Sequence, residues 1–123
     1  MSGYRVVSVV ITKKSGDADT ISAFEIAERA EKSKIFGWAQ DFGFEITESI
    51  IIDVAAHLNI EKIVNEIVEI VTRSKCDGIV AASTEYLKLA GLHNRLPEAA
   101  EKIGKRIWIA DLGSLPLAEK LTA

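Results

Sequence analysis

Two hydroxyl-bearing residues near the N-terminus, Ser8 and Thr12, have the side-chain chemistry of a nucleophile. Both lie in the run YRVVSVVIT, residues 4–12, which is otherwise mainly apolar and β-branched. A hydroxyl acts as a nucleophile when neighbouring groups remove its proton and stabilise the charge that develops. A run that is apolar on both faces is typical of a central parallel strand covered by helices on both sides. We therefore expect Ser8 to be a strand residue whose hydroxyl is satisfied locally, and Thr12 to lie where the strand ends.

Further polar residues follow the other apolar runs. They are Asp53 with His57, the triplet 83–85, and Asp111. Ligands of open parallel sheets bind beyond the carboxyl ends of the strands, so these residues form a possible rim around a site. The same rim arises without any function, because parallel strands must end in polar turns. The candidate catalytic positions, whether working or vestigial, are Thr12, Ser8, Asp53 and Glu85.

The loop KKSGDAD, residues 13–19, is a candidate anion site. Lys13, Lys14 and Ser15 precede a predicted helix that begins near Thr20. Helix N-termini attract anions, so these residues could hold a phosphate. The two carboxylates of the same loop repel anions, and a solvated loop explains the sequence equally well.

Several ligand-binding motifs are absent from the sequence. The segment SGDAD has too few glycines for a dinucleotide or P-loop motif. His57 and His93 lack partners at metal-ligand spacing. Asp53 suits a phospho-accepting receiver domain, but the first strand ends in Ile11 and Thr12 instead of the acidic pair that would hold Mg²⁺. We expect neither a metal nor a cofactor.

Alternating strand and helix patterns predict the fold. They predict a three-layer, doubly wound α/β domain, in which helices cover both faces of a four-stranded, mainly parallel sheet. Ser22 with Glu25 forms a possible capping box for one long helix, or two joined helices, ending at Gly43. Asn59 is a suitable N-cap for the next helix, and Pro97 suits the first turn of a later one. The predicted strands span 4–12, 44–52, 76–83 and 106–111. The first predicted helix begins near Thr20 and ends at Gly43. The later ones span 59–74, 84–92 (a short helix or a turn), 96–104 and 114–122.

Composition limits the class of protein. The chain has 123 residues, with 48% hydrophobic and 27% charged residues and a net charge of −3. We expect a single domain, 1–123, in the cytoplasm, with no membrane span and no secretion signal. A net negative charge argues mildly against autonomous DNA binding and against an anionic membrane surface. Cys76 is the single cysteine, and we expect it to be a small buried residue.

Three segments resemble the catalytic domain of serine recombinases, the resolvase and invertase family. They are WAQDFGFEI at 38–46, IIIDVAA at 50–56 and CDGIVAASTEYL at 76–87. In the last of them Leu87 matches the family pattern, and Glu85 stands where the family has aspartate. The resemblance implies a resolvase-like fold and a serine that attacks a DNA phosphodiester. It also implies several arginines that hold the phosphate.

The resemblance leaves two positions for the nucleophile. If Tyr4 marks the motif, Ser8 is the nucleophile, and Arg5 falls one place early and on the wrong face of the strand. If the strand end marks it, Thr12 is the nucleophile and Val10 replaces the arginine, which is the placement we prefer. Under both placements the later arginines are lost, because Tyr86 and Leu89 occupy their positions.

These departures predict a resolvase-like domain that has lost strand-exchange chemistry and acts through protein–protein contact, regulating a recombinase or a mobile element. The expected partners are a second copy, as a homodimer, or another recombinase-like protein, with DNA bound only weakly. The segment 114–122 would be a stub of the family's dimerisation helix. Two alternatives stay open. One is an active DNA-cleaving domain that uses Ser8 or Thr12, and the other is a small anion- or nucleotide-binding α/β domain.

Overall fold

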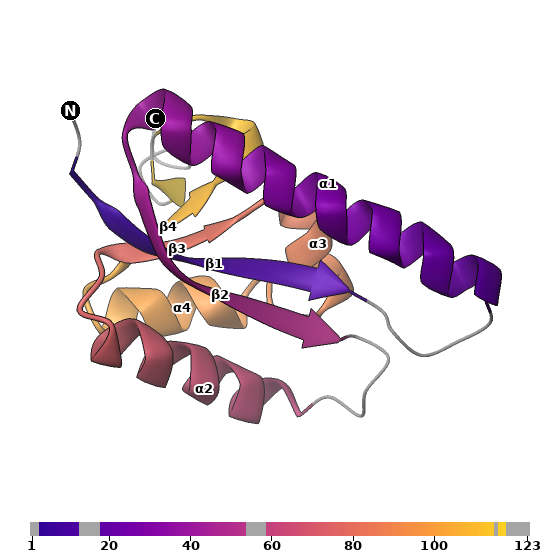
Figure 1. The fold of residues 1–123 in the computed structure, drawn as a ribbon. Helices are drawn as coiled ribbons and strands as arrows, with labels where there is room; N and C mark the ends of the chain where they lie inside the picture. The colour runs from indigo at the N-terminus through magenta and orange to yellow at the C-terminus, as the bar shows by residue number, and fades with distance from the viewer. Residues whose placement is uncertain (1–2, 13–17, 54–58, 115, 118–123) are drawn as a thin grey trace.

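The chain folds into a four-stranded, all-parallel sheet with helices on both faces (Figure 1). The computed structural model describes residues 3–12, 18–53, 59–114 and 116–117, with the backbone alone for residues 18–27 and Leu89. The strand order is β2-β1-β3-β4, so β1 and β3 are central and β2 and β4 are edges. The strands are β1 (Arg5–Thr12), β2 (Glu45–Asp53), β3 (Gly78–Ala81) and β4 (Arg106–Ile109). The predicted fold class is confirmed.

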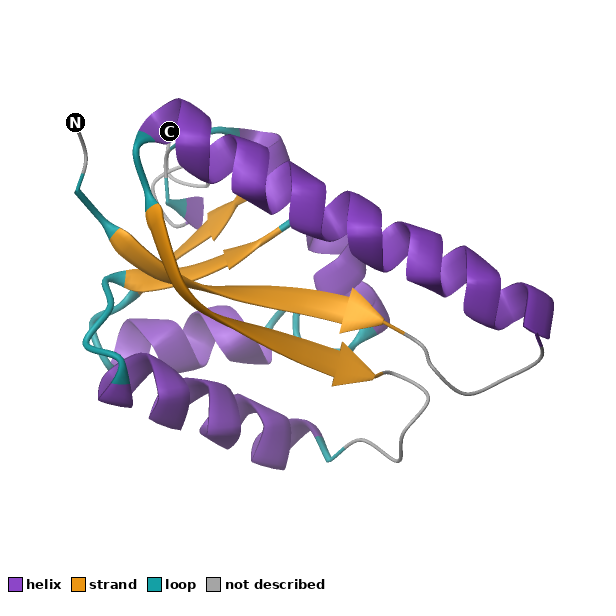
Figure 2. Cartoon of the chain, viewed as in Figure 1, coloured by secondary structure: helices purple, strands orange, loops and turns teal. Residues whose placement is uncertain are grey.

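Both faces of β1 are buried, as its apolar sequence predicts. Val7, Val9 and Ile11 belong to the larger apolar cluster, which also contains residues of α2 (Ile60–Arg73), α3 (Thr84–Leu89) and α4 (Arg95–Lys102). Val6 and Val10 belong to a second cluster with side chains of α1 (Ala18–Phe42). This alternation follows from the two-residue period of a strand. Helix α1 therefore covers one face of the sheet, while α2 and α4 cover the other (Figure 2).

The first helix, α1 (Ala18–Phe42), is one continuous helix. The possible cap at Ser22 is wrong, because the helical backbone begins at Ala18, two residues before the predicted start near Thr20, and Ser22 lies inside the helix. Its end is as predicted, since Gly43 adopts a φ of 74°, which glycine tolerates better than other residues.

The second helix, α2 (Ile60–Arg73), confirms the predicted N-cap. The side chain of Asn59 accepts a hydrogen bond of 3.2 Å from the backbone N–H of Lys62. That bond satisfies one of the donors that a helix N-terminus leaves free. The apolar stripe of this helix packs on the sheet through Val64, Ile67 and Val71.

The C-terminal half differs in detail from the prediction. Helices α3 (Thr84–Leu89) and α4 (Arg95–Lys102) are present, and Pro97 lies in the first turn of α4. The fourth strand, predicted to span 106–111, ends at Ile109. The next residues form a short 3₁₀ helix, η1 (Ala110–Leu112), so Asp111 lies outside the strand, contrary to the prediction. Most of the predicted helix at 114–122 lies outside the described residues.

An aromatic cluster joins α1 to the ends of the sheet. The rings of Trp38 and Phe44 have centroids 4.2 Å apart, and those of Phe44 and Trp108 have centroids 5.0 Å apart. Both indole N–H groups find acceptors, because Trp38 donates to the carbonyl of Gly113 at 2.8 Å and Trp108 to that of Ser114 at 3.1 Å. Buried tryptophans with satisfied N–H groups fix the segment after β4 against α1.

Candidate active site

The ends of β1 and β2 bring two of the predicted site residues side by side. Thr12 pairs with Asp53 in the register of the two parallel strands. Thr12 is only 1% exposed, so solvent and large substrates do not reach its hydroxyl. Asp53 is partly buried at the exit of the edge strand. The predicted rim therefore exists here, but its hydroxyl is buried.

The predicted polar residues after β3 and β4 have structural partners. The Ser83 hydroxyl caps α3 by accepting a bond of 3.4 Å from the backbone N–H of Tyr86. Glu85 is exposed in the first turn of α3, where a negative charge suits the helix dipole. Asp111 forms an ion pair of 2.7 Å with Lys34 of α1. The capping bond of Ser83 and the ion pair of Asp111 give these two residues structural roles.

A buried carboxyl group that the sequence patterns did not single out lies near the end of β1. Glu31 of α1 is 1% exposed, and its Oε1 accepts a bond of 3.0 Å from the backbone N–H of Ile11. Its other oxygen, Oε2, is buried without a hydrogen-bond partner among the described residues. The last pair between β1 and β3 is Val9 with Ala81, so Glu31 binds the backbone of β1 beyond that pair.

Burial raises the pKa of Glu31 to about 7. Loss of hydration is the main cause, and the neighbouring Glu28 adds to it, while the bond from Ile11 and the charge of Lys34 oppose it. The sequence holds a signal for this burial, because Glu31 precedes the buried Ile35 by one helical turn. From the sequence alone, the charge of Glu31 indicates an interruption of the apolar face of α1 and not a buried position.

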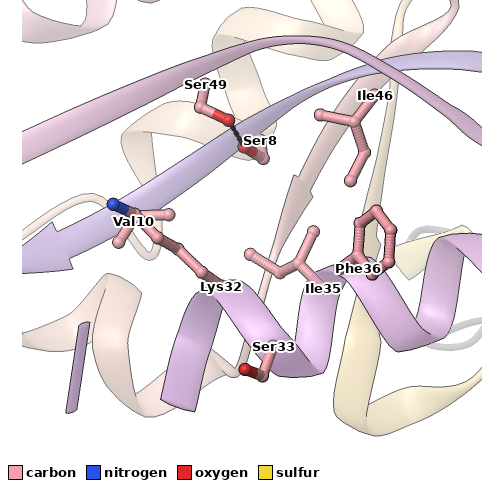
Figure 3. Close-up of a pocket in the computed structure, with 8 residues that line it drawn as sticks. All are labelled: Ser8, Val10, Lys32, Ser33, Ile35, Phe36, Ile46 and Ser49. Atoms are coloured by element: carbon pink, nitrogen blue, oxygen red, sulfur yellow. Dashed lines mark hydrogen bonds between the residues drawn. The ribbon is translucent and has the colours of Figure 1, made fainter. Parts of the chain in front are cut away.

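Ser8 lies in the middle of β1, opposite Ser49 of β2, and not at the strand end. It is 3% exposed, and its Oγ donates a hydrogen bond of 2.6 Å to the Oγ of Ser49 (Figure 3). The prediction that its hydroxyl is satisfied locally agrees with this geometry, in which the partner belongs to the neighbouring strand β2. Beside the pair lies an open pocket of about 430 Å³ between α1, β1 and β2. Its lining consists of Ser8, Val10, Lys32, Ser33, Ile35, Phe36, Ile46 and Ser49.

Among the described residues that line this pocket there is no arginine, and Lys32 is the single cation. Four of the five arginines form interactions elsewhere, and the fifth, Arg29, is exposed on α1 one helical turn before Lys32 and Ser33. Arg5 pairs with Glu45 at 3.5 Å, and Arg73 pairs with Glu48 at 3.4 Å. The remaining pairs are Arg95 with Glu61, and Arg106 with the hydroxyl and ring of Tyr4.

Some predicted site residues cannot be placed. Lys13, Lys14, Ser15 and His57 lie outside the described residues. Within the described part of the chain, no group of three or more His, Cys, Asp or Glu side chains is arranged to hold a metal ion. In the same part, no helix is both long and apolar enough to cross a membrane. Cys76 is buried, as predicted, and its burial raises the pKa of the thiol.

The fold is similar to that of solved recombinase catalytic domains. The C-terminal catalytic domain of ISC1926 TnpA, an IS607-like serine recombinase, matches with a TM-score of 0.61 at 18% sequence identity, covering 95% of this chain and 77% of that chain. The N-terminal catalytic domain of TP901-1 integrase matches with a TM-score of 0.58 at 7% identity, covering 93% of this chain and 82% of that chain. The sequence itself matches no family model and no curated protein.

The class of protein is therefore an α/β domain with the resolvase-like fold of serine recombinase catalytic domains. The fold expected from the sequence resemblance is confirmed. Within this class, the chain is a variant in which the Ser8 and Thr12 side chains are both buried. Among the described residues, no arginine lines the pocket beside Ser8.

We predict that Ser8→Ala lowers the free energy of unfolding by about 1 kcal/mol or less. The substitution removes the donor to Ser49, but Ser49 is exposed and can bond to water instead. Urea denaturation followed by tryptophan fluorescence measures the change, with Ser49→Ala as the matched variant of the other partner. A loss above about 3 kcal/mol would show that the hydroxyl pair has a larger role than one strand contact.

Proposed function

We propose that this chain is a resolvase-like domain that no longer performs strand exchange and acts by contact with another protein, in the regulation of a recombinase or a mobile element. One observation carries the proposal. The Ser8 hydroxyl is buried against Ser49, and the neighbouring pocket contains no guanidinium group. The nucleophile and its electrostatic support are therefore not assembled among the described residues.

The magnitude of the missing support is large. Attack on a phosphodiester develops negative charge on the phosphate oxygens, and fixed donors lower that barrier. One missing donor costs about 2.7–4 kcal/mol, or about 10²–10³ in rate. Lys32 is a point charge on a flexible stem, without the planar two-pronged geometry with which arginine binds phosphate. Several missing donors together reduce the rate below any useful value.

Exposed apolar side chains support a role in protein contact. Phe36 is 59% exposed and Ile51 is 44% exposed. Phe36 belongs to the pocket beside Ser8, and Ile51 lies on the edge strand β2. Large apolar groups gathered on a surface are typical of interaction sites.

Size-exclusion chromatography with light scattering tests the contact role. The chain is measured alone and mixed with the catalytic domain of a serine recombinase such as ISC1926 TnpA. We expect a mass above the 13.4 kDa of one chain, either as a dimer or as a mixed complex. A strict monomer at high concentration that never co-elutes with the recombinase domain would contradict the proposal.

A further inference from the structure

The outer edge of β2 combines features that the proposed function does not use. It is the last strand on its side of the sheet, so one row of its backbone groups has no neighbouring strand among the described residues. Natural proteins protect such edges with bulges, charges or proline. The first half of β2 is protected in this way, because Thr47 is an extra residue in the register with β1 and Glu45 and Glu48 carry charge.

The second half of β2 lacks these protections. The segment Ser49–Ile52 contains no charge and no proline, and it pairs regularly with β1. Ile51 within it is 44% exposed. A long apolar strand edge is either an aggregation hazard or a place where an extended segment adds to the sheet.

Hollows lie on both faces of the sheet beside this segment. The pocket on the α1 side, about 430 Å³, is lined by Ser49 of this segment and also by Phe36 and Ile46 (Figure 3). A second hollow of about 190 Å³ lies on the α2 side, between Ile50–Asp53 of β2 and α2. The side chains of an added strand point alternately to the two faces of the sheet, so they would enter these hollows in turn.

The charges beside the two hollows differ in sign. Lys32 lines the α1-side pocket, whose walls are otherwise apolar or hydroxyl groups. Glu66 of α2 lines the α2-side hollow, whose other lining residues are Asp53 and isoleucines from β2 and α2. The two-residue period of the strand places the Asp53 side chain with Ser49 on the α1 face, so Glu66 is the carboxylate of the α2 side. A lysine or arginine fits there, because its aliphatic stem packs on isoleucine while its charged head meets the Glu66 carboxylate. An apolar side chain fits the α1-side pocket.

We infer that the edge of β2 at Ser49–Asp53 is a docking site for an extended segment of a partner protein, in which apolar side chains facing α1 alternate with basic side chains facing α2. A second copy pairing through β2 fits less well, because β2 contains no lysine or arginine that could meet the carboxylate of the α2-side hollow. The inference rests on the proposed role in protein contact and names the surface and the chemistry of the partner.

A blocked peptide of sequence Thr-Phe-Lys-Val-Lys-Phe-Thr is the probe, and Thr-Phe-Glu-Val-Glu-Phe-Thr is its charge-reversed control. Titration followed by ¹H–¹⁵N NMR should shift the amide signals of Ser49–Asp53 and of Phe36. We expect the control peptide to bind at least tenfold more weakly. Methylation of the Lys, Val and Lys backbone nitrogens should weaken binding by a similar factor, because it removes donors to the strand edge.

Two variants of similar exposure separate the edge from general surface effects. Ile51→Lys should abolish binding of the basic peptide, whereas Phe42→Lys, at a residue that is 41% exposed and lines neither hollow, should leave it unchanged.

Equal binding of both peptides, shifts confined to other surfaces, or a dimer that Ile51→Lys dissociates would each overturn the inference. Complex formation with a recombinase domain that survives Ile51→Lys would keep the proposed function and refute this docking edge. A chain that cleaves DNA and still binds the peptide at β2 would refute the proposed function and keep the docking edge.

Discussion

Replacing Glu31 with glutamine is expected to stabilise the protein by about 3 kcal/mol at pH 8. Burial raises the pKa of Glu31 from an ordinary 4.5 to about 7. Each pKa unit by which the folded state exceeds the unfolded state corresponds to about 1.4 kcal/mol. The folded protein loses this free energy of unfolding at a pH where the group is charged. Glutamine keeps an oxygen that can accept the bond from the backbone N–H of Ile11, but it has no charge to bury.

The pH dependence gives the sign of this effect. Between pH 4.5 and about 7, the folded protein holds a proton on Glu31 that the unfolded chain has released. Stability contributed by this group is therefore fully present below pH 4.5 and falls as pH rises toward 7. Urea denaturation of both proteins from pH 4 to pH 8 measures the difference. We expect it to be near zero at the acid end and largest above pH 7.

A surface glutamate serves as the control for loss of one negative charge. Glu66 is exposed on α2, so Glu66→Gln removes a charge without changing the core. A Glu31→Gln protein whose stability stays equal to that of the parent across the whole pH range would contradict the assignment of a buried, protonated carboxyl group.

Replacing Gly78 with alanine is expected to destabilise the protein by about 3 kcal/mol or more. Gly78 begins β3 in the middle of the sheet, where it pairs with Val6 and with Arg106. A Cβ at this position would clash with the backbone oxygen of Arg106 and would lie 2.7 Å from Cζ3 of Trp108. The backbone of β4 and a fully buried indole ring have no free direction in which to move.

Gly37 provides the matched control for Gly78. It lies inside α1, and a Cβ there would meet nothing within 4 Å. Gly37→Ala should raise the free energy of unfolding by about 1 kcal/mol, because alanine favours helix more than glycine does. Thermal and urea unfolding of the two variants give the comparison. A Gly78→Ala protein within 1 kcal/mol of the parent would show that β3 and β4 separate more easily than the structure implies.

The fold was predictable from the sequence because its strongest patterns are local. The doubly apolar run at β1, the helical period of α2 with Asn59 at its start, and Gly43 after α1 each correspond to an observed element. Element boundaries were less predictable. The possible capping box at Ser22 does not mark the start of α1, because such a pattern is short and common, and the helix begins at Ala18.

The candidate site was only partly predictable. Parallel strands bring their ends together, so the proximity of Thr12 and Asp53 follows from the fold class. The fold class does not predict that the Thr12 side chain and the Glu31 carboxyl group are buried, because their burial depends on how closely α1 packs over the strand end. Arginine partners were also beyond sequence reasoning, since Arg5 and Arg73 pair with acidic residues of the edge strand β2.

The central claim is that, in the part of the chain that the structure describes, the two candidate nucleophiles Ser8 and Thr12 are not placed to attack a phosphodiester. Its most direct test is incubation of the purified chain with supercoiled plasmid DNA, followed by denaturing electrophoresis for a covalent protein–DNA adduct and for nicked DNA. We expect neither product, with the parent indistinguishable from Ser8→Ala and Thr12→Ala. An adduct that forms with the parent and disappears in either alanine variant would contradict the claim.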